Sequence, residues 1–161
     1  PIALIAVAAL VWTALRAADP RRALLAMLAA APVLYAALLE GGVPRIEPIW
    51  ISPRVVAAAG AHWDAAGGRP PPAERPFATA GFHEPSLVFL TGTDTRLLRD
   101  GAEAAQHLAD RPRGLALVRD RYDAAFRAEA ERLGITPRAV ATISGLNYSR
   151  GQRLTLTLYA R

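Results

Sequence analysis

Two long apolar runs near the N-terminus limit what this chain can fold into more than any other feature. Residues 1–15 contain two residues outside the apolar set, and residues 23–39 contain only Pro32. A helix needs ~20 mainly apolar residues to cross a bilayer, with ~17 as the lower limit, because each residue adds about 1.5 Å. The alternative is a pair of alanine-rich helices buried in a soluble protein. We expect a transmembrane helical hairpin at residues 1–40.

The charges between the two runs predict how the hairpin is oriented. This connection carries Arg16, Arg21 and Arg22 against the single acidic residue Asp19. Short loops rich in arginine stay in the cytoplasm. A signal peptide would carry its basic residues before its apolar stretch, whereas here they follow the first run. We therefore expect residues 41–161 to be extracytoplasmic.

The composition of the rest of the chain excludes some classes of function. The net charge is +5, and the 19 basic residues are all arginine. They alternate with acidic residues, as in the sequence Arg119-Asp120-Arg121, rather than gathering on one face as in a nucleic-acid-binding protein. We therefore expect no nucleic-acid partner. The absence of cysteine excludes disulfides and thiolate metal sites.

Residues 41–161 have the pattern of a small α/β domain. Ser52 and Pro53 provide an N-cap and a first helical residue, and Asp100 with Glu103 forms a capping box. The last apolar segment alternates as in a strand that is covered on one face. The predicted helices are 52–64, 100–109 and 122–133, and the predicted strands are 78–82, 86–91, 114–118, 140–146 and 154–159.

This order of elements predicts a mixed sheet. A strand–helix–strand unit favours a parallel pair, and the last two strands are joined by the short turn 147–151, which favours an antiparallel hairpin. The expected fold class is α/β. It consists of two transmembrane helices followed by a small mixed β-sheet domain with about three packed helices and a C-terminal β-hairpin.

The sequence His83-Glu84-Pro85-Ser86 between the first two predicted strands is the most distinctive polar cluster. His83 and Glu84 are candidates for an acid–base pair or a phosphate or metal site. Adjacent residues on an extended segment point to opposite sides, which argues against joint action. The other interpretation is a polar turn whose backbone Pro85 fixes.

Two further arrangements of polar residues have weaker patterns. A nucleophilic triad of Ser86, His83 and Asp94 lacks the Gly-x-Ser-x-Gly surroundings of a nucleophile elbow. The other imidazole and carboxylate groups lack the helical His-Glu-x-x-His spacing of a zinc site, so we expect no metal. These groups are His62, Asp64 and His107.

Two stretches of the domain resemble a known family. They are Ala-Gly-Phe-His-Glu-Pro-Ser-Leu-Val-Phe-Leu-Thr-Gly-Thr at residues 80–93 and Leu-Asn-Tyr-Ser-Arg-Gly at residues 146–151. With the apolar helices before them, they resemble the C-terminal region of the bacterial polyprenyl-phosphate-sugar-dependent glycosyltransferases. That family is related to the lipid A aminoarabinose transferases and to the protein mannosyltransferases.

The resemblance implies a protein of the bacterial inner membrane, with residues 41–161 in the periplasm. Its implied activity is transfer of a sugar from a lipid-phosphate donor to an acceptor outside the membrane. In that family the catalytic acidic residue lies in an early extracytoplasmic loop, so it implies no catalytic residue or cofactor site within this chain. His83 and Glu84 are then candidates for the rim of the active site. The implied partners are membrane lipid, the polyprenyl-phosphate sugar and upstream transmembrane helices of the same protein, since the chain begins inside an apolar run. The alternative function is a membrane-tethered binding or scaffolding module without catalytic activity.

Overall fold

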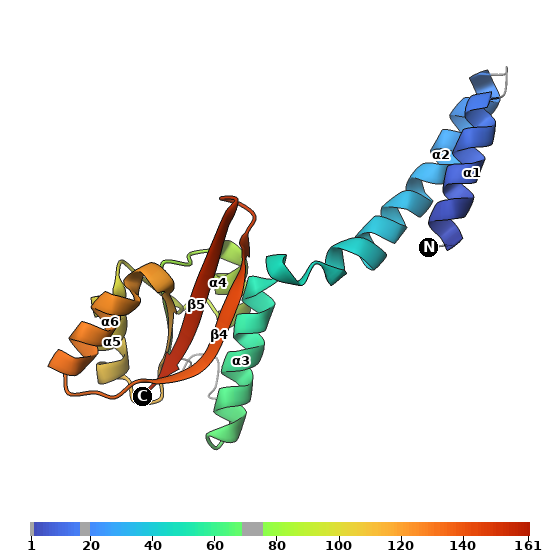
Figure 1. Ribbon diagram of the computed structural model, residues 1–161. Coiled ribbons are helices and arrows are strands. Elements are labelled where there is room, and N and C mark those ends of the chain that lie inside the picture. Colours follow the sequence, from blue (N-terminus) through green and yellow to red (C-terminus); the bar gives the residue numbers. More distant parts are fainter. Residues whose placement is uncertain (1, 17–19, 69–75) are drawn as a thin grey trace. The chain divides into compact units, whose positions relative to one another are not determined.

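The computed structural model describes residues 2–16, 20–68 and 76–161. Within these ranges the fold is mixed α/β, with six α-helices and one five-stranded sheet (Figure 1). The chain divides into two compact units, Pro1–Glu47 and Pro48–Arg161. We call these the N-terminal unit and the C-terminal unit.

The N-terminal unit is helical. Helix α1 is Ile2–Arg16 and helix α2 is Pro20–Ala36, whereas residues 17–19 of the predicted turn lie outside the described residues. The helical path continues beyond α2 through a π-helical segment, Ala37–Gly42, and a 3-10 turn, Val43–Arg45. The helical path therefore extends beyond residue 40, where the predicted hairpin was expected to end. Gly42 has a right-handed φ of −95° instead of the left-handed conformation that terminates helices.

One helix in the described part of the chain is long and apolar enough to cross a bilayer. It is Pro20–Arg45, with 26 residues. Helix α1 has 15 residues, a rise of about 22 Å, which is less than the ~30 Å of the hydrocarbon core. The prediction of two transmembrane helices is corrected to one candidate span.

The C-terminal unit is built on a mixed sheet. The strand order is β2-β1-β3-β5-β4, with β1 parallel to both β2 and β3, and β5 antiparallel to both β3 and β4. This confirms the predicted mixed sheet and the C-terminal hairpin, whereas the parallel pairs involve β1 and β2 rather than the predicted strand at 86–91. The strands are β1 (Phe77–Ala80), β2 (Arg96–Leu98), β3 (Leu115–Arg119), β4 (Arg138–Asn147) and β5 (Gln152–Ala160).

Helices cover both faces of this sheet (Figure 1). Helices α3 (Ile51–Ala65) and α4 (Pro85–Thr91) pack on one face, and α5 (Gly101–Asp110) and α6 (Asp120–Arg132) pack on the other. Strand β3 alternates between two apolar clusters because successive side chains of a strand point to opposite faces. Leu115 and Leu117 join the α3 side, while Ala116 and Val118 join the α5 and α6 side.

Helix α4 occupies the segment for which we predicted a second strand. Pro85 is its first residue, where the fixed φ of proline suits a helix and the missing N–H costs no hydrogen bond. Leu87 is fully buried, whereas Phe89 is 87% exposed, so only one face of this short apolar run is covered. The C-terminal unit therefore has four packed helices, where about three were predicted. The unpredicted strand β2, with three residues, takes the place next to β1.

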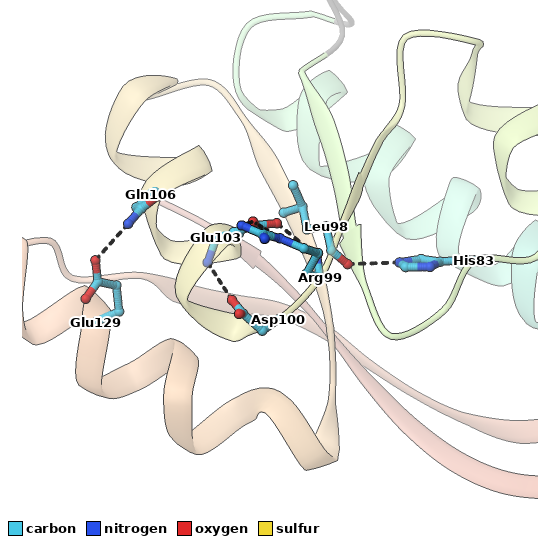
Figure 2. Close-up of polar contacts among 7 residues, drawn as sticks. All are labelled: His83, Leu98, Arg99, Asp100, Glu103, Gln106 and Glu129. Carbon is cyan, nitrogen blue, oxygen red and sulfur yellow. Dashed lines mark hydrogen bonds and ion pairs between the residues drawn. The ribbon is translucent and has the colours of Figure 1, made fainter.

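The predicted start of helix α5 is confirmed in part. Asp100 Oδ1 accepts a hydrogen bond from the Glu103 backbone N at 3.0 Å, as in a capping box. The Glu103 carboxylate accepts from the backbone N of Arg99, one residue earlier than in the usual box, and pairs with the Arg99 side chain (Figure 2). These contacts lower the pKa of Glu103 below its usual value, first through the backbone bond from Arg99.

Helices α5 and α6 approach each other closely at Gly101. A Cβ atom at this position would overlap the carbonyl oxygen of Tyr122 and lie 2.6 Å from the backbone N of Phe126. Farther along, Gln106 of α5 donates to Glu129 of α6 at 3.1 Å (Figure 2). Only glycine at position 101 lets the two backbones pack at this separation.

Candidate functional site

The polar cluster at residues 83–86 follows a sharp turn at the end of β1. Gly81 has φ +89°, a conformation that glycine adopts at little cost, and its added Cβ would lie 2.8 Å from the ring of Tyr122. The buried Thr79 hydroxyl donates to the Phe82 carbonyl at 2.9 Å and closes the turn. The next two residues, His83 and Glu84, are therefore held in fixed places at the carboxyl end of β1.

His83 lies over the ends of two parallel strands. Its Nε2 atom is 3.1 Å from the carbonyl oxygen of Leu98 on β2 (Figure 2). The same atom is 3.3 Å from the carbonyl oxygen of Thr79 on β1. Both partners are acceptors, so Nε2 carries the proton. His83 therefore ties β1 to β2.

Glu84 points to a different set of partners, at the tip of the β4–β5 hairpin. Its Oε1 atom accepts from Asn147 Nδ2 at 2.7 Å and from Ser149 Oγ at 2.8 Å. His83 and Glu84 therefore have different partners, as expected for adjacent residues on an extended segment. The structure joins the two stretches on which the resemblance rests. Glu84 and Asn147, which form one of these contacts, are 63 residues apart in the sequence.

Asn147 fixes the shape of the hairpin turn. Its side chain is 8% exposed, and its Oδ1 atom accepts from Ser149 Oγ at 2.7 Å and from the Arg150 backbone N at 3.2 Å. Ser149 has a single hydroxyl hydrogen, which is shared between Glu84 and Asn147. We call Glu84, Asn147 and Ser149 the hairpin clamp. It holds the turn that carries Tyr148 against the start of helix α4.

An apolar groove with a volume of about 330 Å³ lies beside the hairpin clamp. Ser52 and Ser86, from α3 and α4, are hydrogen-bonded to each other at 2.9 Å among its lining residues. Phe89 and Tyr148 are 87% and 70% exposed, far more than large apolar and aromatic side chains of a core. The groove is lined by Ile49, Trp50, Ser52, Pro53, Ser86, Phe89, Leu90 and Tyr148.

The other predicted polar candidates are placed apart. The Ser86 hydroxyl bonds to Ser52, so it is not part of a triad with His83 and Asp94. Across the described residues, no three His, Asp or Glu side chains are grouped so that they could hold a metal ion. Partial burial, followed by the charge of Arg138, lowers the pKa of His62.

His107 is buried inside the domain. Its Nε2 atom donates to the carbonyl of Pro76 at 3.1 Å, and its buried Nδ1 atom has no hydrogen-bond partner in the described structure. Burial is the main cause that lowers the pKa of His107 below 6.5. His107 is therefore a core residue whose burial favours the neutral imidazole.

Sequence reasoning missed most of this site. The turn at 147–151 was predicted, but nothing in its sequence indicates that Asn147 and Ser149 bind Glu84. The groove was missed because the segment of Phe89 and Leu90 was assigned to a buried strand. A useful signal was available in Pro85, which favours the first turn of a helix and would have left part of the apolar run exposed.

Comparison of the chain with protein-family models, with curated protein sequences and with solved structures finds no match. The arrangement itself has limited chemical capacity. A carboxylate held by two neutral donors, next to an apolar groove, can position or border a ligand.

Proposed function

We propose that this chain is the C-terminal part of a membrane glycosyltransferase, and that its C-terminal unit borders the active site. The enzyme transfers a sugar from a polyprenyl-phosphate donor to an acceptor outside the membrane. One observation carries the proposal: the two stretches that resemble this family, 80–93 and 146–151, meet in the hairpin clamp. A contact between the two stretches would account for the presence of both in the same domain.

The proposed location is the bacterial inner membrane, with the C-terminal unit outside. The 26-residue helix Pro20–Arg45 is the proposed membrane span. Three arginines, Arg16, Arg21 and Arg22, lie near its first end, whereas two, Arg45 and Arg54, lie near its other end. Positive flanks stay in the cytoplasm, so the chain after this helix is extracytoplasmic.

A reporter enzyme fused after Arg161 tests this location. A reporter that is active only outside the cytoplasm should be active there. The same fusion with a reporter that is active only in the cytoplasm should be silent, and activity of that reporter would overturn the orientation.

The C-terminal unit has a supporting rather than a chemical role in the proposal. Sugar transfer from a lipid phosphate needs a base for the acceptor and cationic groups beside the departing phosphate. In this domain Glu84 is engaged by Asn147 and Ser149, and His83 by two backbone carbonyls. These contacts shape a rim, and we expect the chain alone to have no transferase activity.

The test is to measure sugar transfer by the full-length enzyme in membrane vesicles with the variants Glu84→Gln and His83→Ala. Glu84→Gln places an amide opposite the Asn147 amide, and we expect a partial loss of turnover at normal protein abundance. Removal of a general base costs ~100- to 10,000-fold, and the loss here should be smaller. The matched control is Glu131→Gln on helix α6, an exposed carboxylate on the other side of the sheet.

Three results would correct the proposal. Unchanged turnover in Glu84→Gln and His83→Ala would leave the cluster as an ordinary turn. Complete loss at normal abundance would place the chemistry in this domain. Absence of any transfer from polyprenyl-phosphate sugars by the full-length protein would reject the enzyme.

The second candidate function is a membrane-tethered binding module without catalysis. The apolar groove favours it, because mainly apolar pockets with a few polar groups are typical of ligand sites. The full-length sequence separates the two candidates. About ten upstream membrane helices with an acidic first loop support the transferase, and a soluble upstream domain supports the module.

A further inference from the structure

We propose that the apolar groove of the C-terminal unit docks on the surface of the membrane that holds the helix Pro20–Arg45. The occupant is the boundary between the lipid headgroups and the acyl chains. This inference rests on the membrane attachment in the proposed function and goes beyond it, because it assigns a lipid-contacting surface to the folded domain.

The side chains of the groove fit that boundary. Trp50, Phe89 and Tyr148 come from three separate segments and line the same groove. Phe89 and Tyr148 are largely exposed. Tryptophan and tyrosine are enriched at the membrane–water interface, where an apolar ring and a polar tip are both satisfied. An apolar groove of this kind in water is typical of an interaction surface.

The position of the groove in the sequence favours the bilayer as its occupant. Its first lining residue, Ile49, is four residues beyond Arg45, the last residue of the apolar helix. Four extended residues span at most about 14 Å. A groove tethered this closely to the end of a membrane helix stays near the headgroup layer.

The charges around the groove and the fixed hairpin turn also favour this assignment. Arg150, in the same turn as Tyr148, and Arg54, next to the groove residue Pro53, are both exposed and basic. They complement anionic headgroups, while the one carboxylate of the hairpin clamp, Glu84, is already engaged by Asn147 and Ser149. The clamp thus fixes Tyr148 as one wall of a preformed lipid-facing surface.

Spin labelling tests the proposal directly, because the chain has no cysteine of its own. Single cysteines replace Phe89, Leu28 and Glu131 in the intact chain and carry a nitroxide. Each labelled chain is reconstituted into vesicles of phosphatidylcholine with phosphatidylglycerol. Collision with oxygen, which concentrates in the bilayer, is then compared with collision with a water-soluble nickel chelate.

We expect the Phe89→Cys label to lose nickel access and gain oxygen access relative to Glu131→Cys. Glu131 is the control because it is exposed at the end of helix α6, on the other side of the sheet. Phe89 is itself 87% exposed, so its replacement removes no core contact, and circular dichroism checks the fold of each variant. Labels at both positions with the same nickel access would overturn the proposal.

The Leu28→Cys label separates the failure of this inference from that of the membrane attachment. Leu28 buried in lipid with Phe89 in water would reject only the docking surface. Leu28 in water would reject the membrane attachment and the docking together. Phe89 shielded from both reagents, with spin–spin broadening, would show a second copy of the chain on the groove instead of lipid.

Discussion

The two units of this chain use similar apolar residues in opposite ways. In the N-terminal unit Leu25 and Leu28 are 66% and 63% exposed, whereas in the C-terminal unit Leu117 is fully buried between a sheet and a helix. A folded unit in water gains its stability by removing such side chains from solvent. Under the proposed membrane attachment, lipid would give the helix Pro20–Arg45 the cover that the sheet and its helices provide in the C-terminal unit.

The largest expected effect comes from truncating a leucine in each unit. Leu117→Ala removes buried methyl groups from the centre of the sheet and should lower the free energy of unfolding of the C-terminal unit by about 2–5 kcal/mol. Leu25→Ala should leave the unfolding of that unit unchanged. Denaturation of the intact chain in detergent, followed by the β-sheet signal, measures both. Equal effects of the two variants would contradict the difference in leucine burial between the two units.

Adding a charge tests the environment of the exposed leucines. Leu28→Arg places arginine within the proposed span and should cost about 2.5–3.5 kcal/mol of membrane insertion. Leu97→Arg is the matched control, because Leu97 is 52% exposed on the edge strand β2 of the C-terminal unit and should tolerate the change. The fraction of each variant inserted into membranes gives the result. Full insertion of Leu28→Arg would contradict a lipid environment at this position.

Two glycine replacements test whether the close packing of the backbone also differs between the two units. Gly101→Ala forces α5 away from Tyr122 and Phe126, and should destabilise the C-terminal unit by about 1–3 kcal/mol. Gly41→Ala lies in the helical path of the N-terminal unit, where the nearest atom to the new Cβ is 3.7 Å away. That change should be neutral or stabilise the helix by about 0.4–1 kcal/mol. Thermal unfolding of both variants, with circular dichroism, tests the contrast.

The smallest expected effect is a pH dependence confined to the C-terminal unit, which carries all three histidines of the chain. Burial lowers the pKa of His107 in the folded state, so the unfolded state binds more protons below pH 6.5. The free energy of unfolding should therefore fall as pH drops from about 7.5 towards the lowered pKa, by at most about 1.4 kcal/mol per pH unit. His62 acts in the same direction.

The variant His107→Leu serves as the control for this pH dependence. Its unfolding midpoint, measured in urea between pH 7.5 and 5.5, should vary less with pH than that of the wild type. An unchanged slope would show that His107 does not couple protonation to folding.

Local signals predicted much of the fold. Asp100 and the alternating last strand correctly placed helix α5 and the hairpin. The prediction that Ser52 caps helix α3 is wrong, because the helix begins at Ile51 and is preceded by Trp50 without a side-chain cap, although the segment is helical as predicted. The segment 86–91 was wrongly predicted as a strand, because a short apolar run fits either a buried strand or one face of a helix. Strand β2 has only three residues, two of them exposed, and so carries almost no pattern.

The candidate site was less accessible to sequence reasoning than the fold. His83 and Glu84 stood out as a polar cluster, but their partners lie on β1, β2 and the hairpin turn. Which carbonyl or amide they meet depends on how the strands are ordered in the sheet, and no local pattern encodes that order. The groove was missed for the same reason, because its walls come from separate segments that only the fold brings together.

The most direct test of the account is where the intact chain of residues 1–161 resides after cells are broken and their membranes are washed at alkaline pH. Alkaline washing releases proteins that are bound only at the surface and leaves those held by an apolar helix. We predict that the chain remains with the membranes and needs detergent for release, because the helix Pro20–Arg45 is the proposed membrane span. Recovery of the chain from the aqueous fraction as a folded monomer without detergent would contradict the account.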